Sequence, residues 1–221
     1  MNLKKIIFIS IMTGSSLTLI YFQQYFSYNT PLTYNNYIIL PSITLILMIL
    51  ISDFYYSLFG VLIYGLLSGL SKYTNYIQIY DYFIIKDFGI NAFVFSQILL
   101  KHFLCNFVYL GLFFASYNIE QKRKIVFQKF WLFLFLIILI QSIILTTNGI
   151  YFYGKVYKTL VHRVTWWPNL KNLINNYFIL IIWLFNFVPI FINNLLVGIL
   201  VTFIYRSIQK TNYLHILNIK I

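Results

Sequence analysis

Acidic residues are nearly absent from this chain. Only four of its 221 residues are Asp or Glu, against 16 Lys and Arg. A paired-carboxylate catalytic site needs two acids close together, and proton-coupled carriers use acids within their membrane spans. The four acids fall between the apolar runs, so the sequence argues against both classes of protein.

Cysteine and histidine are also scarce. The one cysteine cannot form an internal disulfide, and with the three histidines it shows no metal-ligand spacing. The sequence contains no P-loop and no nucleophile elbow. We therefore expect no enzyme activity, no metal and no cofactor.

Charge of any kind is rare, whereas apolar residues are abundant. Charged residues make up 9% of the chain and hydrophobic residues 61%, while a soluble domain carries about a quarter charged residues. Several apolar runs approach or exceed the roughly 20 residues that cross a bilayer as a helix. The sequence predicts an all-α membrane protein, a six-transmembrane-helix bundle in one domain over residues 1–221. The predicted helices cover 6–22, 37–51, 54–70, 92–117, 130–147 and 176–205.

The net charge of +12 would indicate nucleic acid in a soluble protein, but here the cations lie mostly at helix ends. Their distribution follows the positive-inside rule, so we expect both termini to be cytoplasmic and no nucleic-acid partner. The inner side would hold nine cations and the outer side six. The inner set is Lys4, Lys5, Lys122, Arg123, Lys124, Lys129, Arg206, Lys210 and Lys220, and the outer set is Lys72, Lys86, Lys155, Lys158, Arg163 and Lys171.

Four of the outer cations lie in one predicted loop, residues 148–171, which contains no acid. Tyrosine and tryptophan alternate with these cations. One interpretation is a binding site for an anionic, ring-bearing ligand. The alternative is that the aromatic residues form an interfacial belt. The predicted ligand contacts of this segment are Asn148, Tyr151, Tyr153, Lys155, Lys158 and Arg163.

A second candidate site lies within the fourth predicted helix, where Lys101 and His102 interrupt an apolar run. An ionisable residue within a span usually faces a cavity or a partner, so we add both to the predicted ligand contacts. The alternative is that the Lys101 side chain reaches the outer surface.

Small residues form two helix faces that allow another helix to approach closely. Gly65 and Gly69 give the third helix a packing face. Ser10, Gly14 and Ser15 give the first helix another.

Four segments together resemble the substrate-binding (S) components of energy-coupling-factor (ECF) vitamin transporters, nearest to the folate and riboflavin types. The third helix resembles the Gly-rich span of that family, from Leu58-Phe59-Gly60 to Ser68-Gly69. The other three segments are the Lys-Lys-Ile-Ile-Phe-Ile-Ser-Ile-Met-Thr-Gly start, the 147–163 run, and the last helix with Phe187-Val188-Pro189, Leu195-Leu196-Val197-Gly198 and Tyr205-Arg206.

The resemblance implies a vitamin-uptake protein that binds its vitamin ligand on the outer face. It would then dock, through Ser10, Gly14 and Ser15, against a membrane coupling protein driven by an ATPase pair. The chain itself would hydrolyse nothing. The cations favour folate ahead of riboflavin, and disfavour the cationic thiamine.

Two other interpretations stay open at this point. The chain could be a structural accessory subunit of an organelle-encoded respiratory complex, or a cell-shape membrane protein of the rod complex. A bacterial plasma membrane is favoured over a mitochondrial inner membrane.

Overall fold

The computed structural model describes residues 3–27, 40–83, 89–119, 122–163 and 176–210. In these ranges the chain is almost entirely helical. The elements are α1 (Leu3–Ser27), α2 (Leu40–Ile51), α3 (Phe54–Ser71), α4 (Tyr73–Phe83), α5 (Ile90–Gln97), the π-helix η1 (Ile98–Leu104), α6 (Cys105–Phe107), the 3₁₀-helix η2 (Val108–Ala115), the strands β1 (Ser116–Ile119) and β2 (Lys122–Ile125), α7 (Phe127–Arg163) and α9 (Phe178–Lys210).

Five helical segments among the described residues are long and apolar enough to cross a membrane, as expected of a multi-pass membrane protein. They are Leu3–Tyr21, Phe54–Ser71, Ile90–Ala115, Phe127–Tyr151 and Phe178–Ile208. The second predicted span corresponds to α2, which has 12 residues and is about 18 Å long. This length is less than the roughly 30 Å of a bilayer's hydrocarbon core.

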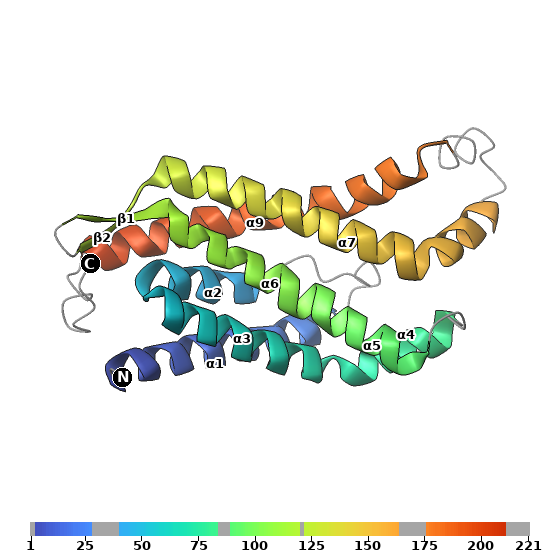
Figure 1. Cartoon of the computed structure of the whole chain (residues 1–221), viewed down its shortest axis with the longest axis horizontal. Helices are drawn as coiled ribbons and strands as arrows, with labels where there is room; N and C mark the ends of the chain where they lie inside the picture. The colour runs from blue at the N-terminus through green and yellow to red at the C-terminus, as the bar shows by residue number, and fades with distance from the viewer. Residues whose placement is uncertain (1–2, 28–39, 84–88, 120–121, 164–175, 211–221) are drawn as a thin grey trace.

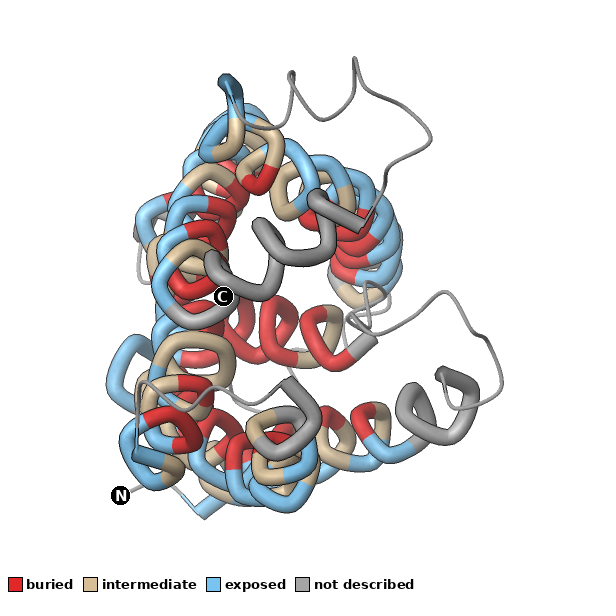
Figure 2. The backbone as a smooth tube through the Cα atoms, turned by 90° about the vertical axis from the view of Figure 1, so that its right-hand side faces the viewer, coloured by how far each residue is buried: buried red, intermediate tan, exposed pale blue. Residues whose placement is uncertain are grey.

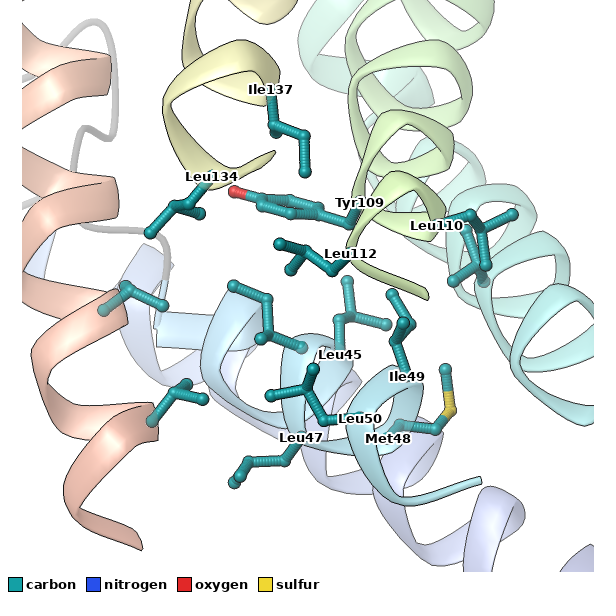
Figure 3. Packing of buried hydrophobic residues seen from close by; sticks show 14 of the residues in the cluster. Leu45, Leu47, Met48, Ile49, Leu50, Tyr109, Leu110, Leu112, Leu134 and Ile137 are labelled. Atoms are coloured by element: carbon teal, nitrogen blue, oxygen red, sulfur yellow. The ribbon is translucent and has the colours of Figure 1, made fainter. Parts of the chain in front are cut away.

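The short helix α2 lies at the centre of the packing. It contacts α1, α3, α9 and η2, and Leu45, Ile46, Met48 and Ile49 are completely buried. Figure 2 shows that buried positions turn inward and exposed positions outward around the bundle. Figure 3 shows the side chains of α2 meeting Leu112 in the core. The Tyr109 ring lies above Leu112 and beside α7 in this view.

One end of the bundle gathers the start of α1, the turn between α2 and α3, the β-hairpin and the end of α9 (Figure 1). Lys5 forms an ion pair with Asp53 there. The guanidinium of Arg206 lies over the Phe127 ring, 4.6 Å from its centroid. We call this the N-terminal end and the other the distal end, where α3 passes into α4 and α7 extends beyond its apolar part.

Two segments predicted as loops contain regular elements in their described parts. The predicted loop 71–91 contains the helix α4, which follows α3 after a single residue, Lys72. The basic stretch after the fourth helix contributes to an antiparallel hairpin in which Tyr117 pairs with Lys124 and Asn118 with Arg123. The fourth helical segment accordingly ends at Ala115 rather than 117.

The largest correction concerns 148–171, because the fifth helix does not end at 147. The helix α7 continues to Arg163 and has 37 residues, a length of about 55 Å. Leaving the apolar run does not by itself end a helix. No proline interrupts this stretch before Pro168, so the backbone keeps its hydrogen bonds.

Candidate functional site

The fourth span is irregular through its middle, and this irregularity forms the centre of the candidate site. Between Ile90 and Ala115 the backbone changes from α-helix to π-helix and then to 3₁₀-helix. Lys101 and His102 both fall in the π-helical part, η1. Short π-helical segments are rare and occur frequently at functional sites.

Irregular backbone within a membrane needs hydrogen-bond partners from side chains. Two carboxamides supply them here. The Asn106 Nδ2 donates to the His102 carbonyl oxygen at 2.6 Å, and the Gln141 Nε2 of α7 donates to the Cys105 carbonyl oxygen at 2.7 Å. The segment is therefore held in place from its own helix and from α7.

The glycine face of α3 lies directly against η1. A Cβ at Gly65 would lie 3.1 Å from the His102 carbonyl oxygen, and a Cβ at Gly69 would lie 2.5 Å from the Cγ2 of Ile98. The close approach of the two helices thus depends on the missing side chains at both positions.

Lys101 and His102 belong to a cluster with Lys72 and Tyr76, which we call the distal cationic cluster. The Tyr76 hydroxyl and the His102 Nε2 share a hydrogen bond of 2.8 Å. The Lys101 Nζ lies over the Tyr76 ring, 5.7 Å from its centroid. Lys72 lies one helical turn before Tyr76, whose backbone N–H donates to the Lys72 carbonyl oxygen at 3.0 Å. Burial lowers the pKa of Lys72, which lies just beyond the third span, below its usual value.

Asn148 faces α5 and pairs with Gln97, a residue that the sequence interpretation did not select. Gln97 Nε2 donates to Asn148 Oδ1 at 2.8 Å, and Asn148 Nδ2 donates to Gln97 Oε1 at 3.1 Å. The two side chains are 0% and 1% exposed. Gln97 lies one helical turn before Lys101, so the pair and the cationic cluster are neighbours. In the sequence, Gln97 could have been recognised as a candidate because it is a carboxamide side chain within an apolar span.

The other predicted contacts of 148–163 lie along the distal part of α7. The Tyr151 side chain is 62% exposed. For Tyr153, Lys155, Lys158 and Arg163 only the helical backbone is described. Positions 151, 155 and 158 follow at intervals of four and three, so they occupy one side of the helix. The predicted segment 164–171 lies outside the described residues.

The helical course of α7 adds a physical reason for its distal cations. A helix C-terminus carries a partial negative charge, which Lys and Arg in the last turns stabilise. Arg163 is the last residue of α7 and Lys158 lies five residues before it. The position of Arg163 is thus favourable with or without a ligand.

A second polar network ties four helical elements together nearer the centre of the bundle. The Tyr109 hydroxyl contacts Asn194 Oδ1 of α9 at 2.6 Å and Ser42 Oγ of α2 at 3.3 Å. Asn194 Nδ2 donates to Gln141 Oε1 at 3.3 Å, and Gln141 also binds the Cys105 carbonyl. This network fixes the π-helical span relative to α2, α7 and α9.

The predicted docking residues lie on the outer side of α1. Ser10 and Gly14 are exposed and Ser15 is half-buried. A Cβ at Gly14 would meet nothing within 4 Å. This surface is separate from the distal cationic cluster.

Metal ligands do not gather anywhere in the described ranges: no group of three or more His, Cys, Asp or Glu side chains occurs there. Comparisons with protein-family models, with curated proteins and with solved structures find no match to the chain. The proposal for function therefore depends on the site itself and on the sequence resemblance.

Proposed function

We propose that the chain is the substrate-binding component of an energy-coupled vitamin transporter, and that it binds a folate-like anion at the distal end of the bundle. In this proposal the chain crosses a bacterial plasma membrane six times, with both termini in the cytoplasm and the distal end outside. A membrane coupling protein and an ATPase pair supply the energy.

The observation that carries this proposal is the position of Lys101 and His102 in a π-helical segment within a membrane span. Burying a cation in hydrocarbon is costly, so intramembrane lysines usually mark a substrate path or a partner. Here the lysine is half-buried, and its Nζ lies over the Tyr76 ring of α4. An anionic solute would be attracted to that end of the bundle.

The exposed face of α1 is consistent with a docking partner. Ser10 and Gly14 are exposed on the outside of the bundle, within the segment Leu3–Tyr21 that is long and apolar enough to cross a membrane. Small residues at such positions allow close helix–helix contact. A coupling protein that uses this face would leave the distal end open to ligand.

Ligand binding by the purified chain tests the proposal. We would reconstitute the protein in phosphatidylcholine nanodiscs and titrate folate, riboflavin and thiamine separately. We expect saturable folate binding that is tighter than riboflavin binding, and no thiamine binding. Binding of thiamine alone, or of none of the three, would refute the proposed ligand class.

Uptake in cells tests the transport step. The chain would be expressed, with and without a coupling protein and ATPase pair from its own genome, in a bacterium that lacks a folate carrier. We expect uptake only when all components are present. Folate binding without coupled uptake would leave a binding protein and contradict the transporter proposal.

A structural accessory subunit remains the second candidate, because the described interior is well filled. The side chains of α2 occupy the centre with no exposure at four positions, and the Gln97–Asn148 pair closes the space between α5 and α7. Co-purification distinguishes the two proposals. A structural subunit would be isolated in a fixed ratio with a respiratory complex, whereas a transporter component would be isolated with ATPases.

A further inference from the structure

The helix α4, which lies outside the candidate membrane spans, contributes a tyrosine that contacts the π-helical segment η1. Tyr76 is only 6% exposed, and it packs with Phe93 and Val94 of α5. Its ring meets His102 edge-on, with the centroids 5.9 Å apart. The hydrogen bond to His102 Nε2 therefore joins two side chains that are both held in place by packing.

Two lysines approach this pair from different elements. Lys72 caps the C-terminal end of α3, where its backbone N–H donates to Gly69. Lys101 comes from η1 and lies over the Tyr76 ring. Both lysines are half-buried, and the backbone of Lys72 is joined to that of Tyr76 by a hydrogen bond of 3.0 Å. Two cations in one region of low dielectric repel each other, and an anion placed between them offsets that repulsion.

The cluster joins the end of one span to the interior of another: Lys72 and Tyr76 lie just beyond the third span, whereas Lys101 and His102 lie within the fourth. The third span ends at Ser71, one residue before Lys72, and α4 begins directly after it. Basic pockets between helices at the interface are known to hold anionic headgroups.

We propose that Lys72, Tyr76, Lys101 and His102 form a binding site for a single phosphate or carboxylate group. The two ammonium groups can each donate hydrogen bonds to its oxygens. Tyr76 and His102 already share one hydrogen bond, so one hydrogen remains between the hydroxyl and the imidazole to be donated to the anion. Such a group can belong to the transported solute or to an anionic lipid. In the first case the site is part of the proposed function and rests on it. The chemistry is the same for both sources, so the experiment separates them.

Lysine variants with a matched control test this site. The test variants are Lys72→Met and Lys101→Met, which keep the length of the side chain and remove its charge. The control is Lys129→Met, which removes an exposed lysine at the N-terminal end of the bundle. Each protein would be examined in two arms: folate titration in phosphatidylcholine nanodiscs, and retention of phosphatidylglycerol from mixed nanodiscs by native mass spectrometry.

We expect at least one arm to respond to both test variants. Loss of a charged hydrogen-bond partner should weaken binding by roughly 10- to 100-fold, while Lys129→Met should stay within about twofold of the wild type. A response in the folate arm assigns the site to the solute, and a response in the lipid arm assigns it to a headgroup. Lys101→Arg should keep much of the binding because it keeps the charge.

The outcomes separate this site from the proposed function. If the affinity for folate is unchanged in both lysine variants and no lipid is retained, the site is refuted and the proposed function stays in place. Lipid retention that depends on the lysines, without folate binding, supports the site and refutes the proposed ligand. Absence of both activities refutes both. If Lys101→Met fails to fold, Lys72→Met at the end of α3 still decides the question.

Discussion

Replacing Gln97 or Asn148 should show how far the distal end depends on its buried amide pair. The substitutions are Gln97→Leu, Asn148→Leu and the double variant. Leucine is close in size to both amides, so the packing is largely conserved. The singles leave one buried amide without its partner, whereas the double variant leaves none.

The two hydrogen bonds and the burial set the magnitude. Side-chain hydrogen bonds in membrane proteins average about 0.6 kcal/mol each, so the reciprocal pair contributes about 1.2 kcal/mol. A buried amide left unsatisfied costs a further 1–3 kcal/mol, approximately. We expect each single variant to lose about 2–4 kcal/mol, and the double variant to lose only about 1 kcal/mol because no amide remains unpaired.

Reversible unfolding in mixed detergent–lipid micelles would measure these free energies as a double-mutant cycle. A strong positive coupling, with the double variant more stable than either single, is the expected result. Additivity within about 0.5 kcal/mol would refute the reasoning, because it would mean that the two amides do not depend on each other. Loss of ligand binding without loss of stability in Asn148→Leu would instead favour Asn148 as a ligand contact.

Two further predictions concern α3 and its end. Gly69→Ala should destabilise the protein by about 1–3 kcal/mol because its Cβ would overlap Ile98. Gly14→Ala should instead stabilise it by about 0.5–1 kcal/mol, because nothing lies within 4 Å of the new methyl group and alanine is the better helix former. Thermal unfolding of both variants measures this, and equal effects would contradict it. NMR titration of methylated Lys72 should give a midpoint below 10.5 in the folded protein, because burial disfavours the charged amine. Since the unfolded chain keeps this proton to higher pH, stability should rise with pH through the lowered midpoint, and an unshifted midpoint would contradict the burial of the amine.

The sequence located several parts of the distal site but not the contacts among them. The run Gly65 to Gly69 predicted close helix packing, and those residues lie against η1. Lys101 and His102 stood out because charge within an apolar run is visible locally. Tyr76 and Gln97 did not stand out, since their partners lie 26 and 51 residues away along the chain.

The course of the chain after residue 147 shows a different limitation. Hydropathy marks where a segment leaves the hydrocarbon, and the prediction ended the helix at that point. The backbone of α7 continues to Arg163 because helical hydrogen bonds need neither lipid nor apolar side chains. Lys155, Lys158 and Arg163, which were expected in a loop, therefore lie on a helix, where their spacing follows the helical repeat.

The sequence by itself determined the class of this protein, because the length and apolarity of a segment decide whether it can cross a bilayer, and both are local properties. Only the tertiary structure decided that α2 fills the centre, that α4 delivers Tyr76 to His102, and that Gln97 and Asn148 pair. Within a membrane each polar group needs a partner, but the sequence does not state which of several amides and hydroxyls will be near enough to provide it.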